Sequence, residues 1–513
     1  MPTIRIAIPI LALLCSNAAA QRAFDAQHRA EQEQVGTGSL WTHTGGNPKH
    51  NSVHATGMPP TLANPVWTNA DHVPVPQSGL VVDGAHVYTL TRDATNATFA
   101  VALDRQTGEE VWATPVAPPV LDSWSSPTID LEHETLLIAS GAVVVALDTD
   151  TGEQRWATEL DAIVVNASPV VTDDLGNRDR AFITTYSFGG GAPAALVCIN
   201  IDPFDATGNP YQPGDIVWSL SLGGDSSGNT AAYQNGRIYL ATASSPGSQR
   251  GTIRCYDITA DTAPASPVWS FTNTINAGFF AGVAIAKGHI YASSYSFSGL
   301  QTSANTVKLN KNTGNLVWSV PTNRTDATPI VLPNGDVIVS GGVATGAFDF
   351  LPFFGSLPSI QYIDDLGSTA KLLWDSALAT HDDLNANGYW DFDEPYLSIG
   401  GWTHQPIAIV VQGTPHLLVG TLPETQPGVN IDHNTALRLI DLTKSPTDPG
   451  FIVDHAPGTG NTPAYTSGWV FTSGQAGISA FEQPSPLLRT RELIDQYTRD
   501  ELTLDELLER LPR

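Results

Sequence analysis

A hairpin motif that recurs along the chain constrains its fold more than any other sequence feature. Residues 102–112 read ALDRQTGEEVW, and 44 residues further on, residues 146–156 read ALDTDTGEQRW. A third copy, LNKNTGNLVW, covers residues 309–318. Repeats of this size indicate a propeller or a solenoid, whose units bury their apolar faces against one another. A length of 513 residues alone would suggest several domains. The repeat indicates instead that most of the chain forms one closed domain.

Each copy of the motif predicts a β-hairpin that ends in a docking tryptophan. An apolar strand runs into Asp148, Gly152 supplies the turn because it can take a positive φ, and the second strand carries Trp156. An indole can wedge between neighbouring sheets, and its N–H needs a partner such as a turn carbonyl. We expect this blade-docking role for seven residues: Trp67, Trp112, Trp156, Trp218, Trp269, Trp318 and Trp374.

Two further strands precede each hairpin, the first of them marked by Ser-Pro or Thr-Pro, so each unit holds four strands. The predicted fold is all-β: an eight-bladed β-propeller of four-stranded antiparallel blades over residues 40–483. Seven blades is the alternative if one long unit is misread. A lone strand at residues 64–70 and three strands at 464–481 have no fourth partner of their own, so we expect them to pair in one composite blade. That pairing closes the ring and removes two exposed sheet edges.

The two ends of the chain differ from the repeats. Residues 1–20 resemble a signal peptide, with Arg5, an apolar run and Ala18-Ala-Ala20, and the residue before Cys15 is Leu14, where a lipid-anchor signal needs a small residue. We therefore expect a protein that is secreted across the inner membrane and is periplasmic or extracellular. Residues 21–39 are polar and predicted to be flexible. Residues 484–513 are predicted to form a helical tail that either packs on the propeller or docks on a partner.

Composition limits the partners. The formal net charge of −27 disfavours binding to nucleic acid and to anionic membranes, although solubility alone explains such a charge equally well. No transmembrane segment is predicted, and we expect a monomer. Cys198 and Cys255 occupy matching positions in successive repeats, and we expect both to be buried free thiols.

One insertion, residues 381–396, fits the template of a twelve-residue calcium loop. Side-chain oxygens fall at positions 1, 3, 5, 9 and 12, glycine stands at position 6 and a backbone carbonyl at position 7. The alternative is a solvated acidic loop that matches by chance. We expect a single structural Ca²⁺ with these ligands: Asp383, Asn385, Asn387, Tyr389, Asp391 and Glu394.

Polar residues near the predicted channel form a weaker signal. The segment that contains His43, His50 and His54 is rich in turn formers, so we expect a loop across one face of the ring and not a metal site. A polar binding surface at one mouth of the channel is possible, although ordinary turn residues would give the same pattern. Its candidate members precede the inner strands: Asp122, Asn166, Asp225, Asn276, Asp326 and Thr403–Gln405.

The motif Ala-x-Asp-x-x-Thr-Gly-x-x-x-Trp resembles the repeat of quinoprotein-type, pyrroloquinoline quinone (PQQ)-like β-propellers. The segment GGNPKH at residues 45–50 is similar to the start of secreted bacterial members described as BamB-like. In the dehydrogenases of this family, the resemblance implies a PQQ over the channel with Ca²⁺, a catalytic aspartate and usually a vicinal disulfide. In the BamB-like members it implies a non-catalytic scaffold of outer-membrane assembly.

These resemblances lead to three functional hypotheses. The first is a secreted, non-enzymatic binding or scaffold protein with a protein partner and a structural calcium loop. This chain has no adjacent cysteines, so we expect no bound PQQ. The second hypothesis is a divergent PQQ-dependent alcohol or sugar dehydrogenase. The third is a propeller hydrolase or lyase acting on polysaccharide, which would need a carboxylate cluster in the channel.

Overall fold

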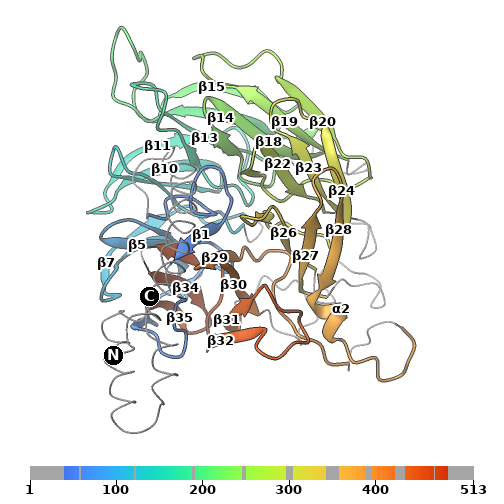
Figure 1. Cartoon of the computed structure of the whole chain (residues 1–513). Coiled ribbons are helices and arrows are strands. Elements are labelled where there is room, and N and C mark those ends of the chain that lie inside the picture. Colours follow the sequence, from blue (N-terminus) through green and yellow to red (C-terminus); the bar gives the residue numbers. More distant parts are fainter. Residues whose placement is uncertain are drawn as a thin grey trace, which may run out of the picture.

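Eight sheets, antiparallel apart from one added strand, follow one another around a ring in sequence order (Figure 1). The computed structural model describes residues 40–56, 59–120, 123–187, 191–244, 250–295, 304–342, 357–388, 394–421, 434–466 and 468–482. The predicted eight-bladed propeller is confirmed. The predicted signal peptide, flexible segment 21–39 and helical tail lie outside the described residues.

The first four blades are built from consecutive strands, with the innermost strand first. Blade 1 contains β3 (Val73–Pro74), β4 (Val81–Val82), β5 (His86–Arg92), β6 (Thr98–Asp104) and β7 (Glu110–Val116). Blade 2 contains β8 (Thr128–Asp130), β9 (Thr135–Ser140), β10 (Val143–Asp148) and β11 (Gln154–Glu159). Blade 3 contains β12 (Val170–Val171), β13 (Arg180–Thr184), β14 (Ala195–Asn200) and β15 (Ile216–Ser221). Blade 4 contains β16 (Asp225–Ser226), β17 (Ala232–Gln234), β18 (Arg237–Ser244), β19 (Gly251–Asp257) and β20 (Trp269–Thr272).

The remaining blades close the ring. Blade 5 contains β21 (Ala284–Ala286), β22 (His289–Ser293), β23 (Ala304–Asn310) and β24 (Leu316–Thr322). Blade 6 contains β25 (Ile330–Val331), β26 (Val337–Gly341), β27 (Ser359–Asp365) and β28 (Ala370–Asp375), followed by the helix α2 (Ser376–Thr380). Blade 7 contains β29 (Ile407–Val411), β30 (Thr414–Thr421), β31 (Ala436–Asp441) and β32 (Ile452–Pro457), with β1 (Val53–Thr56) at its inner edge. Blade 8 contains β33 (Ala464–Thr466), β34 (Trp469–Gly474), β35 (Gly477–Glu482) and β2 (Trp67–Asn69).

Blade 8 is the composite blade expected from the sequence. The strand β2 pairs antiparallel with β35, Trp67 facing Ala480, and so joins the two ends of the propeller. The pairing leaves neither strand with a free edge toward the other, which is how a closed ring avoids exposed sheet edges.

Tryptophans dock seven of the eight blades on the next one; the outer strand of blade 7 has none. The indole N–H of Trp67 donates to the carbonyl of Arg105 (3.1 Å), that of Trp112 to Thr149 (2.9 Å) and that of Trp269 to Lys311 (2.9 Å). Each acceptor lies in the hairpin turn of the following blade. The other four indoles reach the following blade differently: Trp318 donates to the Asp365 carboxylate, Trp156 lies over Gly214, Trp218 packs in a cluster with Tyr256, and Trp374 contacts Phe451.

The glycine of the hairpin turn is the receiving surface for the docking tryptophan. Gly152 has a φ of +71°, and a Cβ added there would lie 2.6 Å from Cδ2 of Trp112. We expect Gly152→Ala to lower the free energy of unfolding by about 2–4 kcal/mol. Alanine is strained in the left-handed backbone region, and its Cβ would overlap with the Trp112 indole. The measurement is unfolding in urea, monitored by tryptophan fluorescence.

Gly176→Ala is the matched control for this substitution. Gly176 has nearly the same φ, +72°, but no atom of the described residues lies within 4 Å of an added Cβ. It should cost only the backbone share, about 1 kcal/mol. Equal losses in the two variants would show that the indole contact contributes nothing.

The two remaining cysteines are buried and free, as expected. Cys198 lies on β14 of blade 3 and Cys255 on β19 of blade 4, so the matching positions in the sequence become equivalent positions in neighbouring blades. Burial raises the pKa of the Cys255 thiol to about 11, which keeps it protonated and unreactive at neutral pH.

Candidate functional site

The central channel is occupied by residues 41–56, which we call the channel segment. The segment contacts the inner strands of successive blades in order. Backbone bonds join Trp41 to Val82 of blade 1 and Thr42 to Ile129 of blade 2, and the carbonyls of Pro48 and Lys49 accept from Tyr233 of blade 4 and Ile285 of blade 5. The inner strands would otherwise present unpaired N–H groups to the channel.

The remaining blades are reached by side chains and by a strand. The His43 ring accepts from the Val171 N–H of blade 3, and the Asn51 amide bonds both the N–H and the carbonyl of Val331 in blade 6. The strand β1 pairs in parallel with β29 of blade 7, and the His54 ring packs on Tyr465 of blade 8. The segment expected as a loop across one face is thus bonded to or packed on all eight blades.

On one side of the channel segment lies a small polar cavity of about 50 Å³. Every blade contributes to its wall, and Thr44 of the channel segment forms part of it. The lining is dominated by hydroxyl and amide side chains, and Asp326 is its one carboxylate among the residues described. A cavity of this size holds one or two water molecules.

Much of the polar wall is made by residues at the starts of the inner strands, where the repeats carry Ser-Pro or Thr-Pro. Ser126 Oγ accepts from the Gly79 N–H of blade 1, Ser168 Oγ accepts from the Ser126 N–H, and Thr230 Oγ1 accepts from the Ser168 N–H. Between blades 6 and 7, Gln405 Oε1 accepts from the Thr328 N–H. Each of these hydrogen bonds ties one inner strand to the next, so much of the polar lining stabilises the ring.

Asp326 is the chemically unusual residue of the cavity. Its Oδ1 is buried without a hydrogen-bond partner among the described residues. Burial raises the pKa of the carboxyl to about 8, and the nearby charge of Arg324 opposes that rise. The carboxyl is therefore mostly protonated at neutral pH.

The polar ring expected at the channel mouth is assembled only in part. Asn166, Asp326, Thr403 and Gln405 line the cavity, whereas His404 lies buried beside it and accepts from the Gly420 N–H. Two members of the expected ring are elsewhere. Asp225 pairs with Arg254, and Asn276 is exposed. Asp122 lies outside the described residues.

Three histidines around the channel are buried and neutral. Burial lowers the pKa of His43, His50 and His404 to about 3 in each case. Both ring nitrogens of His50 are buried without a hydrogen-bond partner among the described residues. A neutral imidazole can bind a metal, but among the residues described no group of three or more His, Cys, Asp or Glu side chains is arranged to hold one.

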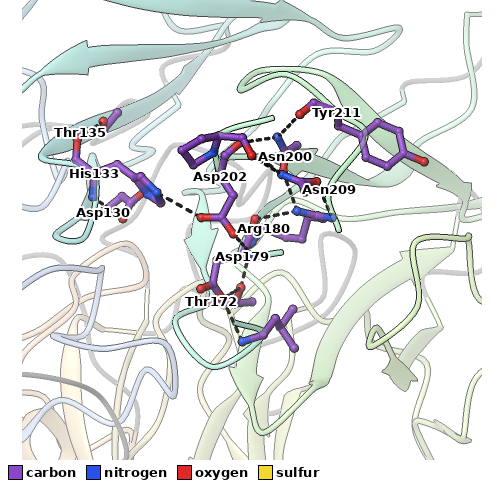
Figure 2. A network of polar contacts seen from close by, with 12 residues as sticks. Asp130, His133, Thr135, Thr172, Asp179, Arg180, Asn200, Asp202, Asn209 and Tyr211 are labelled. Atoms are coloured by element: carbon purple, nitrogen blue, oxygen red, sulfur yellow. Dashed lines mark hydrogen bonds and ion pairs between the residues drawn. The ribbon is translucent and has the colours of Figure 1, made fainter. Parts of the chain in front are cut away.

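A polar network outside the channel joins blades 2 and 3 (Figure 2), and an ion pair of Arg180 extends it to blade 4. His133 bridges the carboxylates of Asp130 (2.8 Å) and Asp202 (3.1 Å), and the hydrogen bond to Asp130 is the main reason that the pKa of His133 is raised. The buried Arg180 donates to Asn200 and pairs with Asp261 of blade 4 (2.9 Å). The contacts of His133 with Asp202 and of Arg180 with Asp261 cross blade boundaries, so this network holds neighbouring blades together.

The described part of the predicted calcium loop has the turns that the template requires. Asp383 accepts from the N–H of Asn387 (3.1 Å) and of Gly388 (2.8 Å), which curls the loop around its first position. Gly388 has a φ of +80°. The Glu394 carboxylate is buried, accepts from the Leu384 N–H (2.7 Å) and lies 2.8 Å from His381 Nε2. Positions 1 and 12 of the loop are thus brought together, while Tyr389 and Asp391 lie outside the described residues.

Two comparisons with known proteins give the family and the fold. The family model described as "Outer membrane protein assembly factor BamB" matches residues 61–185 and 209–350, more than half of the chain. The chain therefore belongs to this family of PQQ-like propeller proteins. No curated protein matches the sequence.

The solved structures that resemble this chain include two dehydrogenases and BamB. A europium-containing methanol dehydrogenase is 12% identical, with a TM-score of 0.58 over 86% of this chain and 90% of its own. The quinohemoprotein alcohol dehydrogenase of Comamonas testosteroni is 11% identical, with a TM-score of 0.57 over 87% and 82%. BamB from Moraxella catarrhalis is 13% identical, with a TM-score of 0.49 over 82% and 99%. At these identities the two dehydrogenases show a shared fold alone. In the described part of this chain, no helix has the length and apolar character needed to cross a membrane.

Proposed function

We propose that this chain is a non-catalytic binding propeller of the bacterial cell envelope, secreted across the inner membrane, which presents its faces to a protein partner. The observation that carries the proposal is the channel segment, whose residues bond to or pack on all eight blades. A ring closed in this way is a rigid platform, and its surface loops are free to vary.

The cavity beside the channel segment does not fit the quinone that the fold family implies. Binding sites for small molecules and cofactors measure about 300–1,000 Å³, whereas this cavity measures about 50 Å³. PQQ carries several carboxylates, and no lysine or arginine is among the described residues that line the cavity. The one carboxylate there would repel such a ligand whenever it is ionised.

The second candidate function is that of a divergent quinoprotein oxidoreductase, and Asp326 is the observation that favours it. A carboxyl with a pKa of about 8 in a polar cavity is the kind of group that enzymes use for proton transfer. The protonated state of Asp326 at neutral pH argues against this second function, because a general base must begin unprotonated.

An activity assay separates the two candidates. The purified protein is incubated with PQQ and Ca²⁺ and then assayed with alcohols and sugars and an artificial electron acceptor. A binding propeller gives no turnover above the protein-free background. Turnover that disappears in Asp326→Asn would establish the oxidoreductase instead.

The insertion after α2 is also proposed to bind one structural Ca²⁺. Its described residues fit the ion, because the side-chain oxygens of Asp383, Asn385, Asn387 and Glu394 are hard ligands on a loop whose ends meet. Bound calcium would neutralise these carboxylates and order the surface loop. The same loop lies outside the channel, so the ion is not expected to take part in chemistry.

Calcium is expected to stabilise the wild-type protein against unfolding. An ion that binds only the folded state adds about 2.7 kcal/mol at a hundredfold excess over its Kd. The measurement is thermal unfolding of the metal-free protein with and without added Ca²⁺. The stabilisation should disappear in Asp383→Ala and persist in Asp382→Ala, which alters a carboxylate just outside the template. A response of equal size in both variants would contradict the site.

A further inference from the structure

A second cavity, of about 170 Å³, lies between the channel segment and the turns of blades 4 and 5. The channel segment contributes Asn47, Lys49 and Asn51 to its wall, Gln234 comes from the end of β17, and blade 5 contributes Lys287 and Lys311. We call this cavity the lysine pocket. Its wall comes from three parts of the chain that are far apart in sequence.

The charge of the lysine pocket is opposite to that of the protein. The chain has a net charge of −27 and only six lysines, and three of them line this one cavity. No Asp or Glu is among the described residues that line it. General solubility explains an acidic surface, but it does not explain why half of all lysines converge on one cavity.

Lys311 is held in place by its neighbours. Its Nζ donates to Gln234 Oε1 (2.7 Å), which fixes the ammonium group in the wall of the pocket. Burial lowers the pKa of Lys311, and the positive charge of Arg237 lowers it further. An anion in the pocket would relieve this repulsion.

Lys287 occupies a backbone position that a lysine rarely takes. It is the first residue of the two-residue turn between β21 and β22, with a φ of +47°, followed by Gly288 at +74°. Turns of this kind favour Asn-Gly, and the corresponding turn of blade 4 is indeed Asn235-Gly236. A strained lysine that lines a basic cavity points to a ligand, because strain of this kind is usually retained at functional positions.

We propose that the lysine pocket binds a phosphoryl group. Lysine is a common phosphate ligand because its ammonium group is a compact charge with three donors, and three lysines line this cavity. The Asn47 side chain uses its oxygen to accept from the Lys49 N–H (2.9 Å), so its NH₂ group remains a donor for the same anion. The group could belong to a free phosphate compound or to a phospholipid headgroup.

The test is calorimetric titration of the full-length protein with inorganic phosphate and with glycerol phosphate. We expect saturable binding by the wild type and an affinity at least about tenfold lower in Lys311→Gln, since each hydrogen bond between charged groups contributes on this scale. Lys444→Ala, which removes an exposed lysine elsewhere, should leave the affinity unchanged. No saturable heat with the wild type, or an equal loss in the Lys444 variant, would overturn the proposal.

Lys287→Asn gives a readout that a purely structural lysine would not produce. Asparagine suits the turn, so this variant should melt at a higher temperature than the wild type while binding phosphate more weakly. Gln412→Asn is the matched control, because Gln412 has a φ of +50° in the β29–β30 turn, away from the lysine pocket. It should gain stability without a change in affinity. If the Lys287 variant bound phosphate with unchanged affinity, Lys287 would not be a ligand, and this would contradict the proposed binding site.

Vesicles distinguish the two sources of the phosphoryl group. Cosedimentation with phosphatidylglycerol vesicles that glycerol phosphate competes away would assign the pocket to a lipid headgroup. Binding of the soluble anions alone would assign it to a free phosphate compound, as the acidic surface of the protein favours.

Discussion

Trp41→Ala is expected to lower the free energy of unfolding by about 3–5 kcal/mol, the usual cost of removing a large buried aromatic side chain. Trp41 is only 2% exposed and bonds Val82 through both backbone groups, and its ring centroid lies 5.2 Å from that of His54, so it anchors the start of the channel segment and contacts its end. Urea unfolding gives the loss. Hydrogen exchange should also accelerate at the inner-strand amides that the segment covers, including those of Val82 and Ile129.

Trp156→Ala is the control for this prediction. Trp156 is half-buried on the outer strand β11 and docks over Gly214, remote from the channel segment. Its removal should destabilise the protein without a specific increase in exchange at the inner strands. If Trp41→Ala left those amides as protected as in the wild type, the channel segment would not be what covers them.

Acid is expected to destabilise the ring through its buried histidines. An unfolded histidine titrates near pH 6.5, whereas His43, His50 and His404 titrate at about 3 in the folded protein. A base with a lowered pKa contributes stability above pH 6.5 that is lost as the pH falls toward 3. Each histidine costs about 1.4 kcal/mol per pH unit in that window, so the three together cost about 4 kcal/mol per unit.

Two carboxyls oppose this acid effect. Burial raises the pKa of Asp179 to about 6 and that of Asp326 to about 8, so each favours the folded state as the pH falls toward 4. The net acid loss is therefore smaller than the histidines alone would give. It is best isolated in a single variant.

His50→Leu isolates one histidine, because the His50 ring has no hydrogen bond to lose among the described residues. We compare the free energy of unfolding of the variant with that of the wild type at each pH. This difference should favour the variant by about 2 kcal/mol more at pH 5 than at pH 7.5. Urea unfolding at the two pH values gives both numbers. If the difference in the free energy of unfolding between the two proteins were the same at both pH values, His50 would not have a lower pKa in the folded protein than in the unfolded protein, which would contradict the prediction.

The repeats could be predicted from sequence because hairpins and docking tryptophans are encoded locally. The Asp-x-x-Thr-Gly turn, the following Trp112 or Trp156, and the unpaired strand near Trp67 each carry their own pattern, so the blades and the composite closure follow from them. Blade 7 lacks the tryptophan at its outer strand but keeps the turn that begins at Asp441, and this was enough to recognise it.

The path of the channel segment could not be predicted because its contacts are made mostly by the backbone. Its glycines, Asn47 and Pro48 indicate turns, but they do not specify which inner strand each carbonyl will meet. The lysine pocket was missed for a different reason. Lys49, Lys287 and Lys311 come from distant repeats, and their common cavity exists only once the ring closes. The scarcity of lysine in the chain was the signal that could have drawn attention to them.

The most direct test of a non-catalytic propeller is a titration of the metal-free protein with PQQ, alone and after addition of Ca²⁺, followed by quinone absorbance and by calorimetric heat. We predict heat from Ca²⁺ binding that Asp383→Ala abolishes, and no uptake of quinone under either condition. Stoichiometric quinone binding, weakened by substitution of Asp326, would contradict it and make the channel cavity the site of an oxidoreductase.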